Sequence, residues 1–243
     1  KILHLFRDEQ YIITLKSRQL GISTLAAAYS LWLMLFHKDK NVLALATTQA
    51  TARNLVTKVI FMYDQLPKWL RLQAVEKNKL SLRLKNGSKV QAKSSNADAA
   101  RSEAVSLLLI DEAAFIDNIE ETFTAAQQTL ATGGQCFALS TPNGIGNWFH
   151  QTWAKAETGE NSFVPVKLPW TVHPERDQAW RDQQDSDLGP RMAGQECDCD
   201  FLSSGATVFE PEDLLFLEQT YQKDPLERRG VDGNLWVWEP ADY

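Results

Sequence analysis

The chain has 243 residues, 44% of them hydrophobic and 10% aromatic, which is enough to bury the core of one α/β domain with a small addition. Its longest apolar run, around residues 31–36, is too short to span a membrane, and its first residues lack a signal-peptide pattern, so we expect no membrane association. The net charge of −6 divides into a balance of +11 over residues 1–101 and −17 over residues 102–243. This asymmetry indicates that one half of the chain faces a polyanion.

In chain order, the sequence alternates strand-like and helix-like segments, after opening in what looks like the end of a helix. Four apolar runs have the length and composition of buried strands: 11–15, 42–46, 107–110 and 136–139. Helices are predicted over 24–37 and between the second strand and about residue 63. The alternation predicts an α/β fold with a mainly parallel sheet flanked by helices. In such sheets ligands bind at the carboxyl ends of the strands.

The first polar cluster follows the strand at 11–15 and resembles a phosphate-binding loop, GxxxxGK[ST]. Counting from Lys16 puts Gly21 at the sixth position and Ser23 at the eighth, but Ile22 stands where the pattern has lysine. Either Lys16 or Arg18 must then supply the positive charge. Taken alone, the motif is weak, and the alternative is a strand-to-helix turn that needs a glycine for its tight curvature.

A basic hairpin is predicted between residues 77 and 97, which hold six basic residues and no acidic residue before Asp98. The basic residues are Lys77, Lys79, Arg83, Lys85, Lys89 and Lys93. A three-residue turn over 86–88 would pair Leu84 with Val90 and Leu82 with Ala92. That register puts four of the six on one solvent face, which we interpret as DNA-binding: Arg83, Lys85, Lys89 and Lys93. The alternative is a solvated face that only keeps the strands from unwanted pairing.

The second polar cluster, Asp111-Glu112, follows the third strand and has the pattern of a Walker B motif. Aspartate would hold the water shell of Mg²⁺, and glutamate would polarise the attacking water. Two acids at this point also suit a helix N-terminus, which is the alternative interpretation.

The third polar cluster, Ser140-Thr141-Pro142-Asn143, follows the fourth strand. Helicase-like ATPases have a sensor of the γ-phosphate at this point, although a plain Pro-Asn-Gly turn would give the same letters. The three clusters together, each at a strand end, predict an ATPase more strongly than any one of them.

Beyond residue 169 the sequence changes to short segments rich in charge, Pro and Gly. We predict an ATPase core over 1–169 and a lid or linker subdomain over 170–243, with a truncated N-terminus. Cys197 and Cys199 flank Asp198, which suggests a metal site as an alternative. Because the three cysteines of the chain form no CxxC pair, we favour reduced thiols.

With these three clusters, the chain resembles the large terminase subunits of tailed phages over nearly its whole length. The resemblance is carried by Ser17–Gly21, Leu109–Ile116 and Ser140–Gly144, together with Asn86-Gly87-Ser88 between them. It implies a P-loop NTPase of the ASCE/RecA-like type that uses ATP and Mg²⁺ to move double-stranded DNA into a procapsid. It also implies a ring on the portal protein, a small terminase subunit as partner, the host cytoplasm as location, and an endonuclease in the full-length protein.

The same resemblance implies roles for individual residues. Nucleotide would be bound by Lys16, Ser17, Arg18, Gln19, Gly21, Ser23, Thr24, Asp111, Ser140 and Thr141. Ser23 and Asp111 would hold the metal, and Glu112 would be the catalytic base. Arg18 matches an arginine finger acting in cis, and Arg101 matches one acting in trans on a neighbouring subunit. Gln10 is not assigned to the adenine, because the family's glutamine lies further upstream.

Two other functions compete with this interpretation. A superfamily-2-like helicase or remodelling ATPase would need a second RecA-like domain, for which residues after 170 leave no room. A nucleotide-binding module that has lost hydrolysis would explain Ile22, but it would have no need for Asp111-Glu112.

Overall fold

The computed structural model describes residues 1–94, 104–130, 133–202, 220, 227–229 and 235–237. Two compact units are present, Lys1–Gly205 and Ala206–Tyr243. In the second unit the described residues form a two-stranded antiparallel ribbon, β9 (Glu227–Arg229) and β10 (Leu235–Val237).

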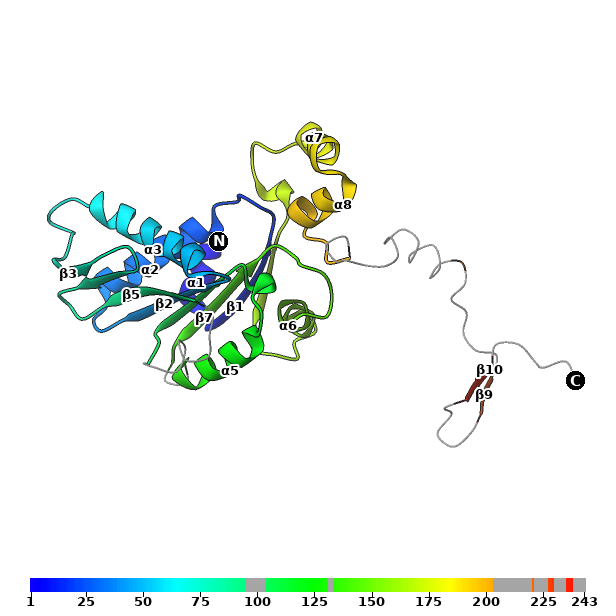
Figure 1. Ribbon diagram of the computed structural model, residues 1–243, viewed down its shortest axis with the longest axis horizontal. Coiled ribbons are helices and arrows are strands. Elements are labelled where there is room, and N and C mark those ends of the chain that lie inside the picture. The colour runs from blue at the N-terminus through cyan, green and yellow to red at the C-terminus, as the bar shows by residue number, and fades with distance from the viewer. Residues whose placement is uncertain (95–103, 131–132, 203–219, 221–226, 230–234, 238–243) are drawn as a thin grey trace, which may run out of the picture. The chain divides into compact units, whose positions relative to one another are not determined.

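Among the described residues of the first unit, one eight-stranded sheet has the order β3-β4-β5-β2-β6-β7-β1-β8 (Figure 1). Its strands are β1 (Tyr11–Lys16), β2 (Asn41–Ala46), β3 (Ala74–Lys77), β4 (Ser81–Leu84), β5 (Lys89–Ser94), β6 (Leu107–Asp111), β7 (Gln135–Ser140) and β8 (Val164–Leu168). The six strands from β5 to β8 in this order are parallel to one another. At the other edge, β4 pairs antiparallel with both β5 and β3. The predicted α/β fold with a mainly parallel sheet is confirmed.

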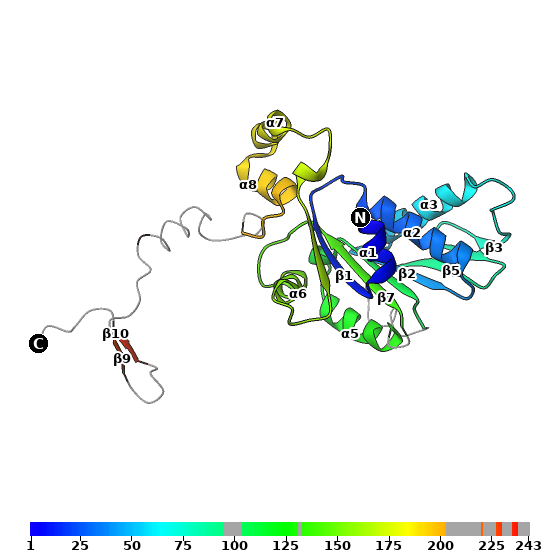
Figure 2. The same ribbon diagram turned by 180° about the vertical axis from the view of Figure 1, so that it is seen from behind.

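Helices cover the two faces of the sheet, as the front and back views show (Figures 1 and 2). One face packs against α1 (Ile2–Asp8), α2 (Ile22–Phe36) and α3 (Gln49–Asp64). The other packs against α5 (Ile119–Leu130) and α6 (Trp148–Glu157). Alternate strand residues enter the two cores, because successive side chains of a strand point to opposite faces: Val42 and Ala44 to the first, Leu43 and Leu45 to the second.

The segment after β8 is built from short elements: η2 (Trp170–Val172), α7 (Gln178–Leu188), α8 (Pro190–Ala193) and the π-helical turn η3 (Gly194–Asp198). Arg181 of α7 is buried and donates to Asp198 of η3 through Nε (3.0 Å) and Nη2 (2.7 Å). This hydrogen-bonded ion pair raises the pKa of Arg181 and fixes α7 against η3. The predicted lid and its boundary at residue 170 stay predictions.

The four predicted strands and two predicted helices are present, with ends at most two residues from those predicted. None of the helices in the described ranges is long and apolar enough to cross a membrane.

The predicted register of the basic hairpin is wrong by two residues: Leu82 pairs with Val90, not with Ala92. The turn covers 85–87, because Ser88 is buried directly before β5, where its Oγ donates to His37 O (2.9 Å). Gly87 completes the turn with a φ of +86°. Moving the turn by one residue shifts the pairing by two, so the faces of the hairpin are unchanged.

Candidate nucleotide-binding site

Three polar loops leave neighbouring strands at the carboxyl edge of the sheet. Strand β7 lies between β1 and β6, with Leu15 paired to Ser140 and Leu139 paired to Asp111. Strands in a sheet lie about 4.8 Å apart, so the loop after β1 begins about 10 Å from Asp111. The sheet topology therefore brings together the three clusters that sequence reasoning selected.

The phosphate loop joins β1 to α2. Gln19 has a φ of +59°, and Gly21, at the N-cap of α2, has a φ of +77°, which favours glycine. A Cβ atom added to Gly21 would meet nothing within 4 Å, so the space beside it is open. The backbone N–H groups of residues 19–24 donate to no residue that the structure describes. Such unpaired N–H groups at a helix N-terminus bind anions, phosphate above all.

The beginning of this loop is fixed from outside. Ser17 N donates to the carbonyl oxygen of Leu168 (2.8 Å). Arg18 N and Ser17 Oγ both donate to the carbonyl oxygen of Glu196, at 2.8 Å and 3.1 Å. Sequence reasoning missed Glu196, which no motif marks.

The positive charge of the loop does not come from its seventh position, because Ile22 is only 7% exposed and packs in the first hydrophobic core. Lys16 ends β1 and is half-buried. The Arg18 side chain is 69% exposed and lies 3.4 Å from the carboxylate of Glu196, Nη1 to Oε2. Both candidates for the missing lysine remain.

The carboxylate turn, residues 111–115, starts at the end of β6. Glu112 is exposed with a φ of +56°, and the 3₁₀ helix η1 (Ala113–Phe115) follows it. Ala114 N donates to Ser140 Oγ (3.1 Å), and Asn143 Nδ2 donates to Ala114 O (3.0 Å). Helix α5 begins only at Ile119, so the two acids do not sit in its first turn.

The third cluster connects the carboxylate turn to the segment after β8. Ser140 and Thr141 are buried, and Ser140 holds the turn as described. Gln195 Nε2 donates to Pro142 O (3.0 Å), and Asn147 Nδ2 to Asn143 O (2.7 Å). Residues 195 and 196 therefore contact the third cluster and the phosphate loop at once.

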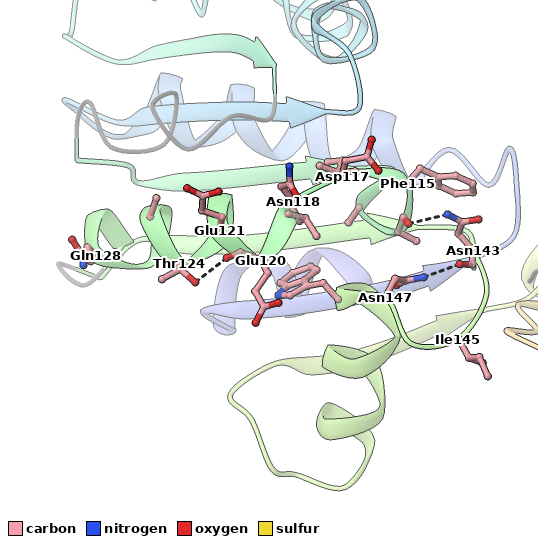
Figure 3. Close-up of a pocket in the computed structure, with 16 residues that line it drawn as sticks. Phe115, Asp117, Asn118, Glu120, Glu121, Thr124, Gln128, Asn143, Ile145 and Asn147 are labelled. Carbon is pink, nitrogen blue, oxygen red and sulfur yellow. Dashed lines mark hydrogen bonds between the residues drawn. The ribbon is translucent and has the colours of Figure 1, made fainter.

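A hollow of about 850 Å³ lies beside the carboxylate turn (Figure 3). It is lined by η1, residues 116–118, α5 as far as Gln128 and residues between 143 and 148, with Phe115, Asp117 and Trp148 among them. Neither Glu112 nor the phosphate loop lines it, so it adjoins the proposed nucleotide site without being part of it.

Along the basic hairpin, buried apolar side chains alternate with basic side chains on the opposite face, as predicted. Leu82, Leu84 and Val90 are buried, whereas Arg83 and Lys85 are exposed and Lys89 and Lys93 are half-buried. Sequence reasoning missed that β3 places Glu76 opposite Arg83. A hydrogen bond from Ser81 lowers the pKa of Glu76, with Arg83 contributing, so this face carries one fixed negative charge.

The remaining candidates divide into one that lies outside the described residues and several that are structural. Arg101 lies in the stretch 95–103, outside them. Gln10 Nε2 donates to Gly134 O (3.0 Å), which explains this residue without a ligand. Burial raises the pKa of the Cys199 thiol to about 12 and also raises that of Cys197, which favours the neutral thiol at both positions. No cluster of metal-ligating side chains occurs among the residues with a defined position.

Comparison with known proteins identifies the family and the fold. The profile of the family described as "Terminase large subunit, T4likevirus-type, N-terminal" matches residues 13–216. The ATPase domain of the large terminase of Thermus phage P74-26 superposes with a TM-score of 0.67 at 21% identity, covering 82% of this chain and 92% of that domain.

Two further structures have the same fold. The large terminase of a second thermophilic bacteriophage, in complex with ADP, gives a TM-score of 0.64 at 14% identity, and the match covers 80% of this chain and 49% of that one. The N-terminal domain of the DNA packaging ATPase from bacteriophage phi29 gives 0.52 at 14% identity, covering 72% and 97%. These likenesses confirm the predicted P-loop NTPase fold.

Proposed function

The chain belongs to the family of terminase large subunits of the T4-like type, whose N-terminal part it matches, and from this premise we propose that it hydrolyses ATP to drive double-stranded DNA into a procapsid. The observation that carries the proposal is the pairing of β1, β7 and β6. It sets a loop with unpaired N–H groups close to Asp111 and Glu112.

Hydrolysis needs a bound triphosphate and a polarised water. The N–H groups of residues 19–24 are suited to bind phosphate oxygens, with Lys16 and Arg18 as the cations. Glu112 is exposed and held by a turn anchored in the sheet, so its carboxylate is free to orient a water molecule. Arg18 would act as the finger in cis, and Arg101 of a neighbouring subunit as the finger in trans.

The residues present fit a magnesium ion. Mg²⁺ prefers oxygen ligands, and it usually takes one or two carboxylates with substrate phosphates and water. Asp111 is partly exposed at the end of β6, with Oδ1 accepting only from its neighbour Glu112 N (3.2 Å) among described groups, and Ser23 lies in the first turn of α2. These two residues would hold the ion. Bound there, Mg²⁺ would neutralise charge on the phosphates.

Several partners follow from the proposed motor activity. DNA would contact the solvent face of the hairpin, where Arg83 and Lys85 are exposed. We further propose a homo-oligomeric ring on the portal protein, a small terminase subunit as partner, and the host cytoplasm as location. Endonuclease activity is proposed for the full-length protein, and no residue described above is assigned to it.

Family membership supports neither alternative function. A superfamily-2-like helicase is not the family matched, and a module without hydrolysis would not need a base at Glu112.

The proposal is tested by steady-state ATP hydrolysis with and without double-stranded DNA. We expect slow basal hydrolysis that rises with DNA. Replacing Arg83 and Lys85 by glutamine should leave basal hydrolysis intact and reduce by about two the slope of log K for DNA against log salt, roughly one unit per lost phosphate contact.

The matched control replaces Arg53 and Lys58 by glutamine. These residues lie on α3, which covers the opposite face of the sheet. If both double variants change the salt slope equally, the hairpin is only a solvated face. If the parent protein shows no hydrolysis at all, the motor proposal is wrong.

A further inference from the structure

Arg176 lies against the phosphate loop, although 159 residues separate it from Ser17 and it belongs to no motif. Its Nη1 donates to Ser17 Oγ (3.2 Å) and to the carbonyl oxygen of Arg18 (3.1 Å). Ser17 is fully buried and Arg176 is half-buried, so the hydrogen bond to Ser17 is partly buried, whereas the one to Arg18 O lies at the surface. Hydrogen bonds from a charged donor are about twice as strong as neutral ones.

The guanidinium is held in place by its own surroundings. It lies 4.4 Å from the ring centre of Trp180, a cation–π contact, and Trp180 in turn lies 6.0 Å from Trp170. Asp177 caps α7 by accepting from Trp180 N (2.8 Å), which fixes the turn that carries Arg176. The side chain is therefore oriented before any ligand binds.

A further cation would compensate for the lysine that the phosphate loop lacks. Ile22 fills the position of the usual lysine from within the core, and Arg18 faces the carboxylate of Glu196. Arg176 keeps three N–H donors, one on Nε and two on Nη2, that donate to no acceptor in the described part of the chain.

We propose that Arg176 is a positioning residue of the nucleotide site. It holds the beginning of the phosphate loop through Ser17 Oγ and Arg18 O, and it supplies part of the positive charge that Ile22 cannot. Nucleotide affinity then depends on the docking of residues 170–200 onto the loop. This inference rests on the proposed ATP site.

The test measures equilibrium binding of ATPγS to the whole chain. Arg176→Ala should weaken binding by roughly tenfold, the effect of losing one charge-assisted hydrogen bond. Arg176→Lys should recover most of the affinity, because an ammonium group can donate to both oxygens. Arg176→Gln, which donates without charge, should fall between the two.

Arg71→Ala is the matched control. Arg71 is also half-buried, and its Nη1 also donates to a backbone carbonyl, that of Asp64 (3.1 Å), but it lies between α3 and β3. The control should lower the melting temperature as much as Arg176→Ala does while leaving nucleotide affinity unchanged. If Arg176→Ala does not fold, the lysine and glutamine variants carry the comparison.

Two results would overturn the inference: Arg176→Ala binding ATPγS within twofold of the parent protein, or Arg176→Lys binding no better than the alanine variant, which would mean that only packing on Trp180 matters. Failure of the proposed function is recognised separately, because the parent protein itself would then not bind ATPγS.

Discussion

The phosphate loop and the carboxylate turn both leave parallel strands of one sheet, but the chain holds them in different ways. The carboxylate turn is fixed by Ser140, which ends the strand directly beside its own, and by Asn143 three residues later. The beginning of the phosphate loop is fixed by Arg176 and Glu196, which belong to a segment that the chain reaches only after the sheet is complete.

The sheet therefore positions the carboxylate turn, whereas the docking of a later segment of the chain positions the beginning of the phosphate loop. A base that must orient water gains from a rigid support, and Glu112 has one. The beginning of the phosphate loop is held instead by Arg176 and Glu196, which reach it by the docking of their segment and not from a neighbouring strand. Gln195 and Glu196 are adjacent, so a shift of this segment on the loop would also reach the third cluster through Pro142.

The largest effect should follow from the loss of the base. Glu112→Gln keeps the size of the side chain but removes the charge that polarises water, so turnover should fall by roughly 10²–10⁴-fold. Nucleotide affinity should remain, because the phosphate loop does not depend on this turn. The measurements are steady-state turnover and ATPγS binding. Glu120→Gln, an exposed glutamate in the first turn of α5, is the control and should turn over normally. Near-parental turnover of Glu112→Gln would remove this residue from the role.

The next effect should appear in the phosphate loop as lost affinity rather than lost turnover. Lys16→Ala should weaken ATPγS binding by about 10–100-fold, since hydrogen bonds to charged groups contribute about 1.5–3 kcal/mol. Lys155→Ala, an exposed lysine on α6, should bind normally. A silent Lys16→Ala beside a damaging Arg18→Ala would assign the missing charge to Arg18.

The sequence predicted those strands whose apolar pattern matches their burial in the two hydrophobic cores. The strands β1, β2, β6 and β7 are mostly apolar along their length, because both faces of a central parallel strand are covered. Strand β8 was missed because Pro165 interrupts its pattern, which is tolerated at an edge of the sheet. Strand β3 was missed because three of its four residues are exposed, so it shows no alternation.

The candidate site was predictable only in part, for a related reason. Motif spacing marks residues that act within one loop, so Gly21, Asp111 and Ser140 could be selected from the sequence. Arg176 and Glu196 reach the site by tertiary packing, at separations of 159 and 179 residues from Ser17. No local pattern records such a contact. Whether the selected residues carry the proposed roles stays a prediction.

The smallest effect should follow from loss of the hydrogen bond that supports the carboxylate turn. This change tests most directly whether the carboxylate turn and the phosphate loop are held separately. Ser140 Oγ is the acceptor for Ala114 N, and both residues are buried. Ser140→Ala leaves that N–H without its partner, which should lower the free energy of unfolding by about 1–3 kcal/mol. If the sheet positions Glu112 through this bond, turnover should also fall, by up to about tenfold, with ATPγS affinity within twofold of the parent protein.

Ser30→Ala separates the support of Glu112 from general loss of stability. Ser30 is equally buried, and its Oγ donates to Ala26 O (2.8 Å) within α2. Ser30→Ala therefore also removes a buried hydroxyl group and its hydrogen bond. Turnover per folded molecule should be normal in Ser30→Ala and reduced in Ser140→Ala. Equal turnover would mean that Asn143 alone fixes the turn. A loss of nucleotide affinity in Ser140→Ala would mean that the third cluster supports the phosphate loop as well, and the two regions could no longer be treated as separately held.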